Sequence, residues 1–256
     1  MMQFPGMQFH DSPVMNALLN PAVVFGMPLA YVAGILLLAK IMAPLTAFEL
    51  KGPMMVYNVV QIVLCTYMTI GLFPVVEGLS NPFGVDSSFS KAGEWFVFVH
   101  YLSKYLDWCD TLFIVLKKKK SQLSFLHLYH HATIGPIWGW LCLLGVANGT
   151  VRYGAMINSM THVFMYTHYL VTALGFRNPL KNWLTRWQIG QFYSCFLHSV
   201  VVLCSGMETK MPSSVAWMQF FYQSTMIYLF TFKMAYVPGY VPLPDEPKKD
   251  KAKKAK

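Results

Sequence analysis

The 256-residue chain has little charge and few cysteines. Charged residues make up 12% of it, against about a quarter in soluble domains, and hydrophobic residues make up 55%. Its five cysteines show no paired spacing, which argues against a disulfide framework and indicates small buried side chains. The first residues lack a basic region and a small-residue cleavage site, so we expect no cleaved signal peptide. This composition excludes an ordinary soluble domain.

The chain contains long apolar segments with few charged residues. Seven of them approach the roughly 20 residues that a helix needs to cross a bilayer. We therefore predict an all-α fold, a polytopic membrane protein with seven transmembrane helices in one domain over residues 23–236. The predicted spans are 23–43, 55–77, 92–116, 124–146, 151–174, 187–207 and 215–236.

The basic residues predict the orientation of these spans. With a lumenal N-terminus, sixteen lysines and arginines fall on the cytosolic side and three on the other side. The positive-inside rule therefore favours a lumenal segment at 1–22 and a cytosolic C-terminus. The positive charge is divided among loops and does not form a stripe with aromatic residues, so we expect no nucleic-acid partner.

The C-terminal segment 237–256 is rich in proline, acid and lysine, and we predict a disordered basic cytosolic tail. It ends with Lys253, Lys254, Ala255 and Lys256. Lysines at the third and fourth positions from a cytosolic end resemble a dilysine retrieval signal. We therefore expect the endoplasmic reticulum membrane, although a solvated basic tail is the plainer interpretation.

Ionisable side chains inside apolar spans are rare and costly, so they point to the functional site. The predicted fourth span carries His127, His130 and His131 within one helical turn of one another. The third span carries Lys104, Asp107 and Asp110. Lys104 and Asp107 are spaced to pair, and a purely structural ion pair is the alternative for them.

The next two spans add polar residues on single helix faces. The fifth carries Asn158, His162 and Tyr166, and the sixth carries Gln188 and Gln191. For the two glutamines, hydrogen bonding between helices is as good an interpretation as substrate contact. Basic residues surround the cytosolic ends of these spans and would suit an anionic head group such as that of an acyl-CoA. Those residues are Lys117, Lys118, Lys119, Lys120, Arg177, Lys181 and Arg186.

Three classes of membrane protein are considered as explanations for the histidine cluster. A membrane di-iron desaturase needs several histidine boxes, and this chain has one, with enough ligands for a single metal ion at most. A seven-helix receptor or transporter gives no reason for the HxxHH stripe. The third class uses imidazole directly as a nucleophile and general base in acyl transfer, with no metal.

Four motifs resemble those of the ELO-type fatty acid elongases. KYLDWCDT resembles their KxxE/DxxDT motif, LHLYHH the HxxHH box, NSMTHVFMYTHY the NxxxHxxMYxYY motif, and LTRWQIGQF the TxxQxxQF motif. They occur in the family's order across Lys104–Phe192. Two positions depart from the pattern: Asp107 replaces a commoner glutamate, and His168 stands where tyrosine is usual.

The resemblance implies a 3-ketoacyl-CoA synthase, an acyltransferase that condenses a long-chain acyl-CoA with malonyl-CoA and releases CO2 and CoA. It implies that His130 forms an acyl-imidazole, that His162 is its partner, and that His127 and His131 orient it. Lys104, Asp107 and Asp110 would hold a polar network. The implied substrate contacts are Asn158, Tyr166, Gln188, Gln191, Lys117, Lys118, Lys119, Lys120, Arg177 and Lys181.

No cofactor is implied, because malonyl-CoA is a co-substrate whose decarboxylation supplies the carbanion. The form QxxxLHxYHH, from Gln122, resembles elongases of polyunsaturated acids, so we expect a polyunsaturated C18–C20 acyl chain. A saturated or monounsaturated chain is the alternative. The expected partners are membrane lipid and the ketoreductase, dehydratase and enoyl reductase of the elongation cycle, with a homo-oligomer as a further option.

Overall fold

The computed structural model describes residues 6–73, 81, 83–177, 181–205 and 211–232, and within these ranges it contains helices and no strand. The all-α prediction is confirmed. Two short 3-10 helices, η3 (Lys120–Gln122) and η4 (Gly149–Val151), precede α6 and α7. The α-helices are α1 (Pro13–Leu18), α2 (Pro21–Met42), α3 (Lys51–Leu72), α4 (Lys91–Leu106), α5 (Trp108–Leu116), α6 (Phe125–Leu143), α7 (Arg152–Ala173), α8 (Lys181–Cys204) and α9 (Ser213–Phe232).

These helices overlap all seven predicted spans, with α4 and α5 together covering the third. In the described part of the chain, α2 and α3 are the helices whose length and composition suffice for crossing a membrane. Taken singly, α1, α4 and α5 are too short, with 6, 16 and 9 residues. The number of spans and their orientation stay predictions, and residues 1–5 and the tail 237–256 lie outside the described residues.

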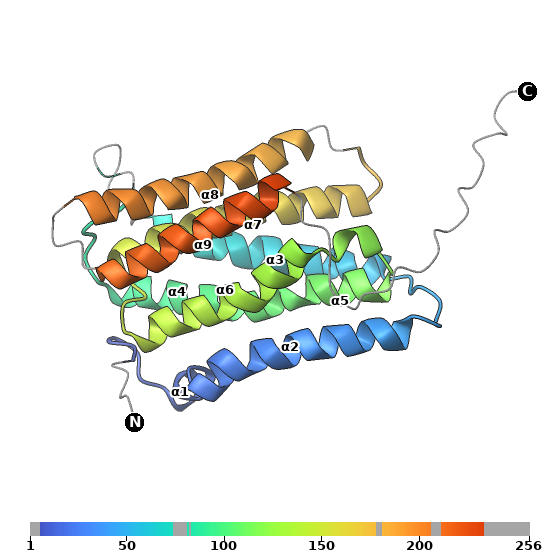
Figure 1. Ribbon diagram of the computed structural model, residues 1–256, viewed down its shortest axis with the longest axis horizontal. Helices are drawn as coiled ribbons and strands as arrows, with labels where there is room; N and C mark the ends of the chain where they lie inside the picture. The colour runs from blue at the N-terminus through green and yellow to red at the C-terminus, as the bar shows by residue number, and fades with distance from the viewer. Residues whose placement is uncertain (1–5, 74–80, 82, 178–180, 206–210, 233–256) are drawn as a thin grey trace, which may run out of the picture.

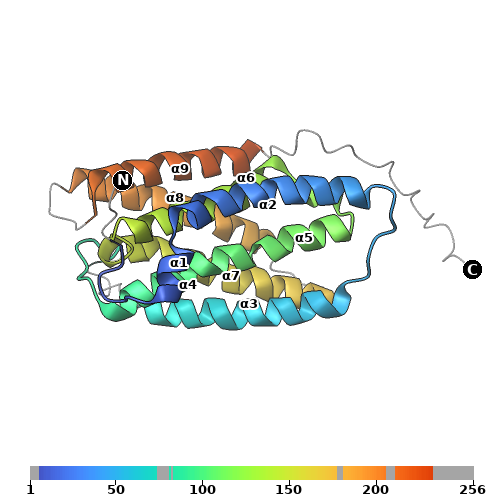
Figure 2. The ribbon, with the colours of Figure 1, turned by 90° about the horizontal axis from the view of Figure 1, so that it is seen from below.

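The long helices run along one axis and alternate in direction (Figures 1 and 2). In Figure 1, α2 and α9 both run from the left toward the right, and α9 ends short of the right end of the bundle, where α5 ends and α6 begins. Six of the helices form a ring. The neighbouring pairs in this ring are α3–α4, α4–α6, α6–α9, α9–α8, α8–α7 and α7–α3. The remaining long helix, α2, packs outside the ring against α5 and α6.

Side-chain caps fix where several helices begin. Asn20 accepts from the N–H of Ala22 at the start of α2, and Ser90 accepts from that of Gly93 at the start of α4. Ser124 accepts from the N–H of His127 at 3.1 Å, so α6 begins at Phe125 and His127 lies in its first turn. Each cap satisfies one backbone donor that the first helical turn leaves unpaired.

The predicted span 92–116 is interrupted at Asp107, which separates α4 from α5. There the N–H of Asp110 bonds the carbonyl of Asp107 at 3.1 Å, a tighter turn than α-helical geometry. Lys104 and Asp107 nevertheless pair across this break, as their spacing predicted, with Nζ of Lys104 3.2 Å from Oδ2 of Asp107. The break occurs beside the two carboxylates of the site.

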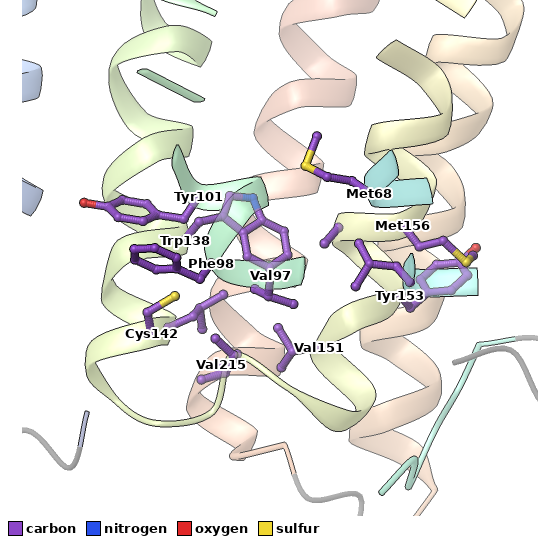
Figure 3. Packing of buried hydrophobic residues seen from close by; sticks show 14 of the residues in the cluster. Met68, Val97, Phe98, Tyr101, Trp138, Cys142, Val151, Tyr153, Met156 and Val215 are labelled. Atoms are coloured by element: carbon purple, nitrogen blue, oxygen red, sulfur yellow. The ribbon is translucent and has the colours of Figure 1, made fainter. Parts of the chain in front are cut away.

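Part of a large hydrophobic cluster fills the end of the ring away from the histidines. Trp138, Tyr101, Phe98 and Val97 belong to it, and they lie side by side in Figure 3. Gly139 allows the close packing there, because a Cβ at this position would lie 2.7 Å from Val24 Cγ1 and 2.8 Å from Tyr101 Cε2. This contact brings α6 against both α2 and α4.

Candidate active site

The histidine box occupies the first turns of α6. The rings of His127 and His131 lie 4.2 Å apart between centroids, and those of His130 and His131 lie 5.6 Å apart. Nε2 of His127 is 2.8 Å from Oγ1 of Thr111, which is 2.7 Å from the hydroxyl of Tyr31. The helical spacing therefore brings the three imidazoles together. Hydrogen bonds through Thr111 on α5 and Tyr31 on α2 hold His127 in place.

His130 differs from its neighbours because it lines a cavity between α6, α7, α8 and α9. Of the four site histidines in the described residues, His127, His131 and His162 are not in its lining. The lining is mostly apolar, with Asn158, Gln191, Gln219, Tyr222 and Gln223 as its other polar members.

The cavity extends from the histidine end of the bundle toward the hydrophobic cluster. His130 and Leu141 both line it from α6, and eleven residues of helix separate them by roughly 16 Å. Val151 and Val215 line the same far end from η4 and α9. A long space with a mostly apolar lining suits a ligand with a hydrocarbon tail.

A network of buried polar groups lies beside the cavity. Asp107 is 2% exposed, and its Oδ1 accepts from Nε2 of Gln61 at 2.8 Å and from the hydroxyl of Tyr166 at 3.2 Å. The Tyr166 hydroxyl is also 2.7 Å from Oδ2 of Asp110. Tyr57 joins the group through contacts of 3.2 Å to Tyr166 and 2.8 Å to Gln61. The carboxylates are thus held by α3 and α7.

Lys104 connects this network to the cavity. Its ammonium lies 3.2 Å from Oδ2 of Asp107 and 2.9 Å from Oδ1 of Asn158. An ammonium group only donates, so the Asn158 atom that it contacts must be the carbonyl oxygen. The amide NH2 of Asn158 then points away from Lys104, and Asn158 itself lines the cavity beside His130.

The other predicted site residues occupy different surroundings. His162 is buried, with Nδ1 3.8 Å from Oδ2 of Asp107, which places it in the carboxylate network. Tyr166, expected at the substrate, is fully buried in that network. Gln191 lines the cavity, whereas Nε2 of Gln188 contacts Sδ of Met165 at 3.6 Å and Gln188 is absent from the described lining.

The basic residues lie at the end of the bundle where α6 begins (Figure 1). Nζ of Lys117 contacts Sδ of Met54 at 3.4 Å, and Nζ of Lys118 donates to the carbonyls of Ala43 and Leu45. Lys118 therefore ties the α2–α3 connection to the end of α5. Lys119, Arg177 and Lys181 are exposed. The side chain of Lys120 lies outside the described part.

Sequence reasoning missed several members of the site. Tyr57 and Gln61 were overlooked on the second predicted span, and Thr133, Gln219 and Tyr222 on the fourth and seventh. Tyr57 and Gln61 are four residues apart on an apolar helix, a spacing that places both on one face and could have indicated them. Nothing in the local pattern distinguishes Tyr222 from the many other tyrosines.

In the ranges that the structure describes, no group of three histidine, cysteine, aspartate or glutamate side chains is arranged to hold a metal ion.

A family model described as ELO, the GNS1/SUR4 family, matches residues 16–248. The chain belongs to the ELO family. The resemblance that the four motifs indicated is thereby confirmed, and ELO-family proteins are membrane proteins, as the apolar segments predicted.

Relatives of this ELO-family chain carry elongase names. It is 47% identical to fatty acid elongase 5 of Leishmania major over 223 residues, 87% of each chain. It is 41% identical to fatty acid elongase 5 of Trypanosoma cruzi over 219 residues, 85% of each chain. It is also 31% identical to very long chain fatty acid elongase 4 of Homo sapiens over 220 residues, 81% of this chain and 66% of the relative.

Proposed function

We propose that this protein is a fatty acid elongase that acts as a 3-ketoacyl-CoA synthase, joining a long-chain acyl-CoA to malonyl-CoA. The observation that carries the proposal is that His130, alone among the four described site histidines, lines the long apolar cavity. An acyl chain in that cavity would present its thioester to the imidazole. The ELO relatives support the same class of reaction.

The reaction follows from imidazole chemistry. A ring nitrogen of His130 attacks the thioester carbonyl, the C–S bond breaks, and CoA leaves as a thiolate that takes up a proton. Malonyl-CoA then loses CO2, and the resulting carbanion attacks the acyl-imidazole carbonyl. The new C–C bond forms as the C–N bond breaks, which releases 3-ketoacyl-CoA and regenerates the histidine. No metal or cofactor takes part in these steps.

Asn158 is suited to stabilise the oxyanion of both attacks. Its carbonyl oxygen is held by Lys104 at 2.9 Å, so its NH2 is left as a donor in the wall that also contains His130. A preorganised donor aimed at a developing oxyanion contributes about 100- to 1000-fold to the rate in acyl transfer. The Lys104–Asp107 pair would thus act on catalysis by fixing the orientation of Asn158.

The substrate class rests on the sequence. The form QxxxLHxYHH supports a polyunsaturated C18–C20 acyl chain, with a saturated or monounsaturated chain as the alternative. We further propose a multi-pass endoplasmic reticulum protein whose histidine end faces the cytosol beneath Lys119, Arg177 and Lys181. There it would receive CoA esters and pass its product to the ketoreductase, dehydratase and enoyl reductase.

Purified protein incubated with acyl-CoA and labelled malonyl-CoA, without NADPH, tests the activity. A labelled 3-ketoacyl product that is insensitive to chelators is expected, and His130→Ala should abolish it. Acyl-CoA alone should leave an acyl group on the peptide that contains His130, detectable by mass spectrometry. His10→Ala, which changes a histidine of the N-terminal segment outside the cavity, is the matched control.

Iron-dependent oxygen uptake without a condensation product would overturn the proposal in favour of a desaturase, for which family membership provides no support. Full activity of His130→Ala would remove that residue from its role. Yeast cells expressing the chain and fed C16 to C22 acids would show which chains are lengthened, and failure to lengthen any C18 or C20 polyunsaturated acid would refute the substrate class.

A further inference from the structure

A chain of hydrogen bonds connects His130 to the backbone through two side chains. The hydroxyl of Tyr222 on α9 lies 3.2 Å from Nδ1 of His130 and 3.2 Å from Oγ1 of Thr133. Oγ1 of Thr133 lies 2.7 Å from the carbonyl oxygen of Tyr129, four residues earlier on α6. Three contacts in series thus begin at the imidazole and end at a carbonyl group.

The carbonyl end determines the direction of every bond in this series. A carbonyl oxygen only accepts, so Thr133 donates its single hydroxyl hydrogen to Tyr129. Thr133 can then only accept from Tyr222, which uses the single hydrogen of the tyrosine hydroxyl. The oxygen of Tyr222 can therefore only accept from Nδ1 of His130, because any other assignment leaves one contact without a hydrogen.

We propose that Tyr222 and Thr133 are positioning residues that hold His130 as its Nδ1–H tautomer and so keep the lone pair on Nε2. This inference rests on the proposed function, in which His130 attacks a thioester. In a neutral imidazole one nitrogen carries the hydrogen and the other carries the nucleophilic lone pair. When Nε2 takes the acyl group, the positive charge is shared with Nδ1–H, which donates to the Tyr222 oxygen.

The other box histidines lack this arrangement among the described contacts. His127 bonds Thr111, which bonds Tyr31, and each of these two hydroxyl groups can donate or accept, so the direction is not determined. Nδ1 of His131 is buried without a hydrogen-bond partner in the described residues. A defined tautomer and access to the cavity therefore coincide at His130.

Tyr222→Phe and Thr133→Val remove one hydroxyl group each while keeping nearly the same shape. Single-turnover acylation by acyl-CoA should slow by about 10- to 100-fold in Tyr222→Phe, the range for losing a hydrogen bond to a group that becomes charged. Its KM for acyl-CoA should stay close to the parental value. Thr133→Ser keeps the hydroxyl and should acylate near the parental rate, whereas Thr133→Val should slow. Tyr193→Phe, an exposed tyrosine on α8, is the matched control.

Nitrogen-15 NMR of histidine-labelled protein reports the tautomer directly. The His130 signals are assigned by their loss in His130→Gln. We expect the hydrogen on Nδ1 in the parental protein and a mixture of both tautomers in Tyr222→Phe.

Hydrogen on Nε2 in the parental protein, parental acylation by Tyr222→Phe, or an equal loss in Thr133→Ser and Thr133→Val would each overturn the proposal. If the parental protein never acquires an acyl group, the condensing function fails, while the NMR result still decides the tautomer.

Discussion

Gln61 on α3 donates a hydrogen bond of 2.8 Å from Nε2 to Oδ1 of Asp107, at the break between α4 and α5. The two residues are 46 positions apart in the chain and both are buried. The bond shows that α3, which carries no aspartate, glutamate, histidine or arginine, still contributes to the site, because it supplies a donor to a buried carboxylate.

Replacing Gln61 with leucine should leave one carboxylate oxygen of Asp107 without this donor. A buried polar group that loses its partner costs about 1–3 kcal/mol, so we expect lower thermal stability and condensing activity reduced by about tenfold or more. Thr69→Val on the same helix, where the hydroxyl bonds the carbonyl of Cys65, is the control. Equal melting temperatures and rates for the two variants would show that the Gln61 bond is dispensable.

Lys104 and Asp107 should behave as a coupled pair. Removing one member of a buried ion pair destabilises a protein by about 3–5 kcal/mol, because the remaining charge is left uncompensated. We expect Lys104→Met to lower the melting temperature strongly, and the double variant Lys104→Met, Asp107→Leu to recover part of the loss. Stability is measured by thermal unfolding in detergent for both single variants and the double variant. If the stability losses of the two single variants add up to that of the double variant, the pairing is contradicted.

The far end of the cavity should limit the length of the acyl chain. Leu141→Trp adds bulk roughly 16 Å along α6 from His130, so shorter chains should become the preferred substrates. Products from a mixture of C16 to C22 substrates measure the preference. Leu37→Trp, on a 59% exposed position of α2 outside the ring, is the control. An unchanged product profile in Leu141→Trp would show that the chain does not occupy this cavity.

Glu94 should anchor the N-terminal segment. Its carboxylate, on a residue that is 4% exposed, accepts from the N–H groups of Gln8 at 2.6 Å and Phe9 at 2.8 Å, and lies 3.0 Å from Nδ1 of His10. Glu94→Gln replaces one acceptor oxygen with a donor, so we expect faster protease cleavage within residues 6–12. The exposed Glu49→Gln provides the charge-matched comparison, and equal cleavage of both would reject the anchor.

The sequence by itself determined the helical class, the positions of the helices and the family. The length of an apolar segment is a local property of the sequence, and the four motifs keep their spacing whatever the packing. Ser124, for example, caps the helix that carries the histidines through contacts within three residues. Glu94 shows the limit of this reasoning, because its partners near residue 8 cannot be inferred from a helical pattern.

Only the tertiary structure decided which imidazole meets the cavity. The positions of His127, His130 and His131 along α6 do not distinguish them. The way α6 packs against α7, α8 and α9 places only His130 of the three in the described lining of the cavity. Tyr222 reaches it across 92 positions of chain, and Gln61 reaches Asp107 across 46. Such contacts depend on how whole helices pack and on the break at Asp107. Neither can be inferred from the spacing of residues along the chain.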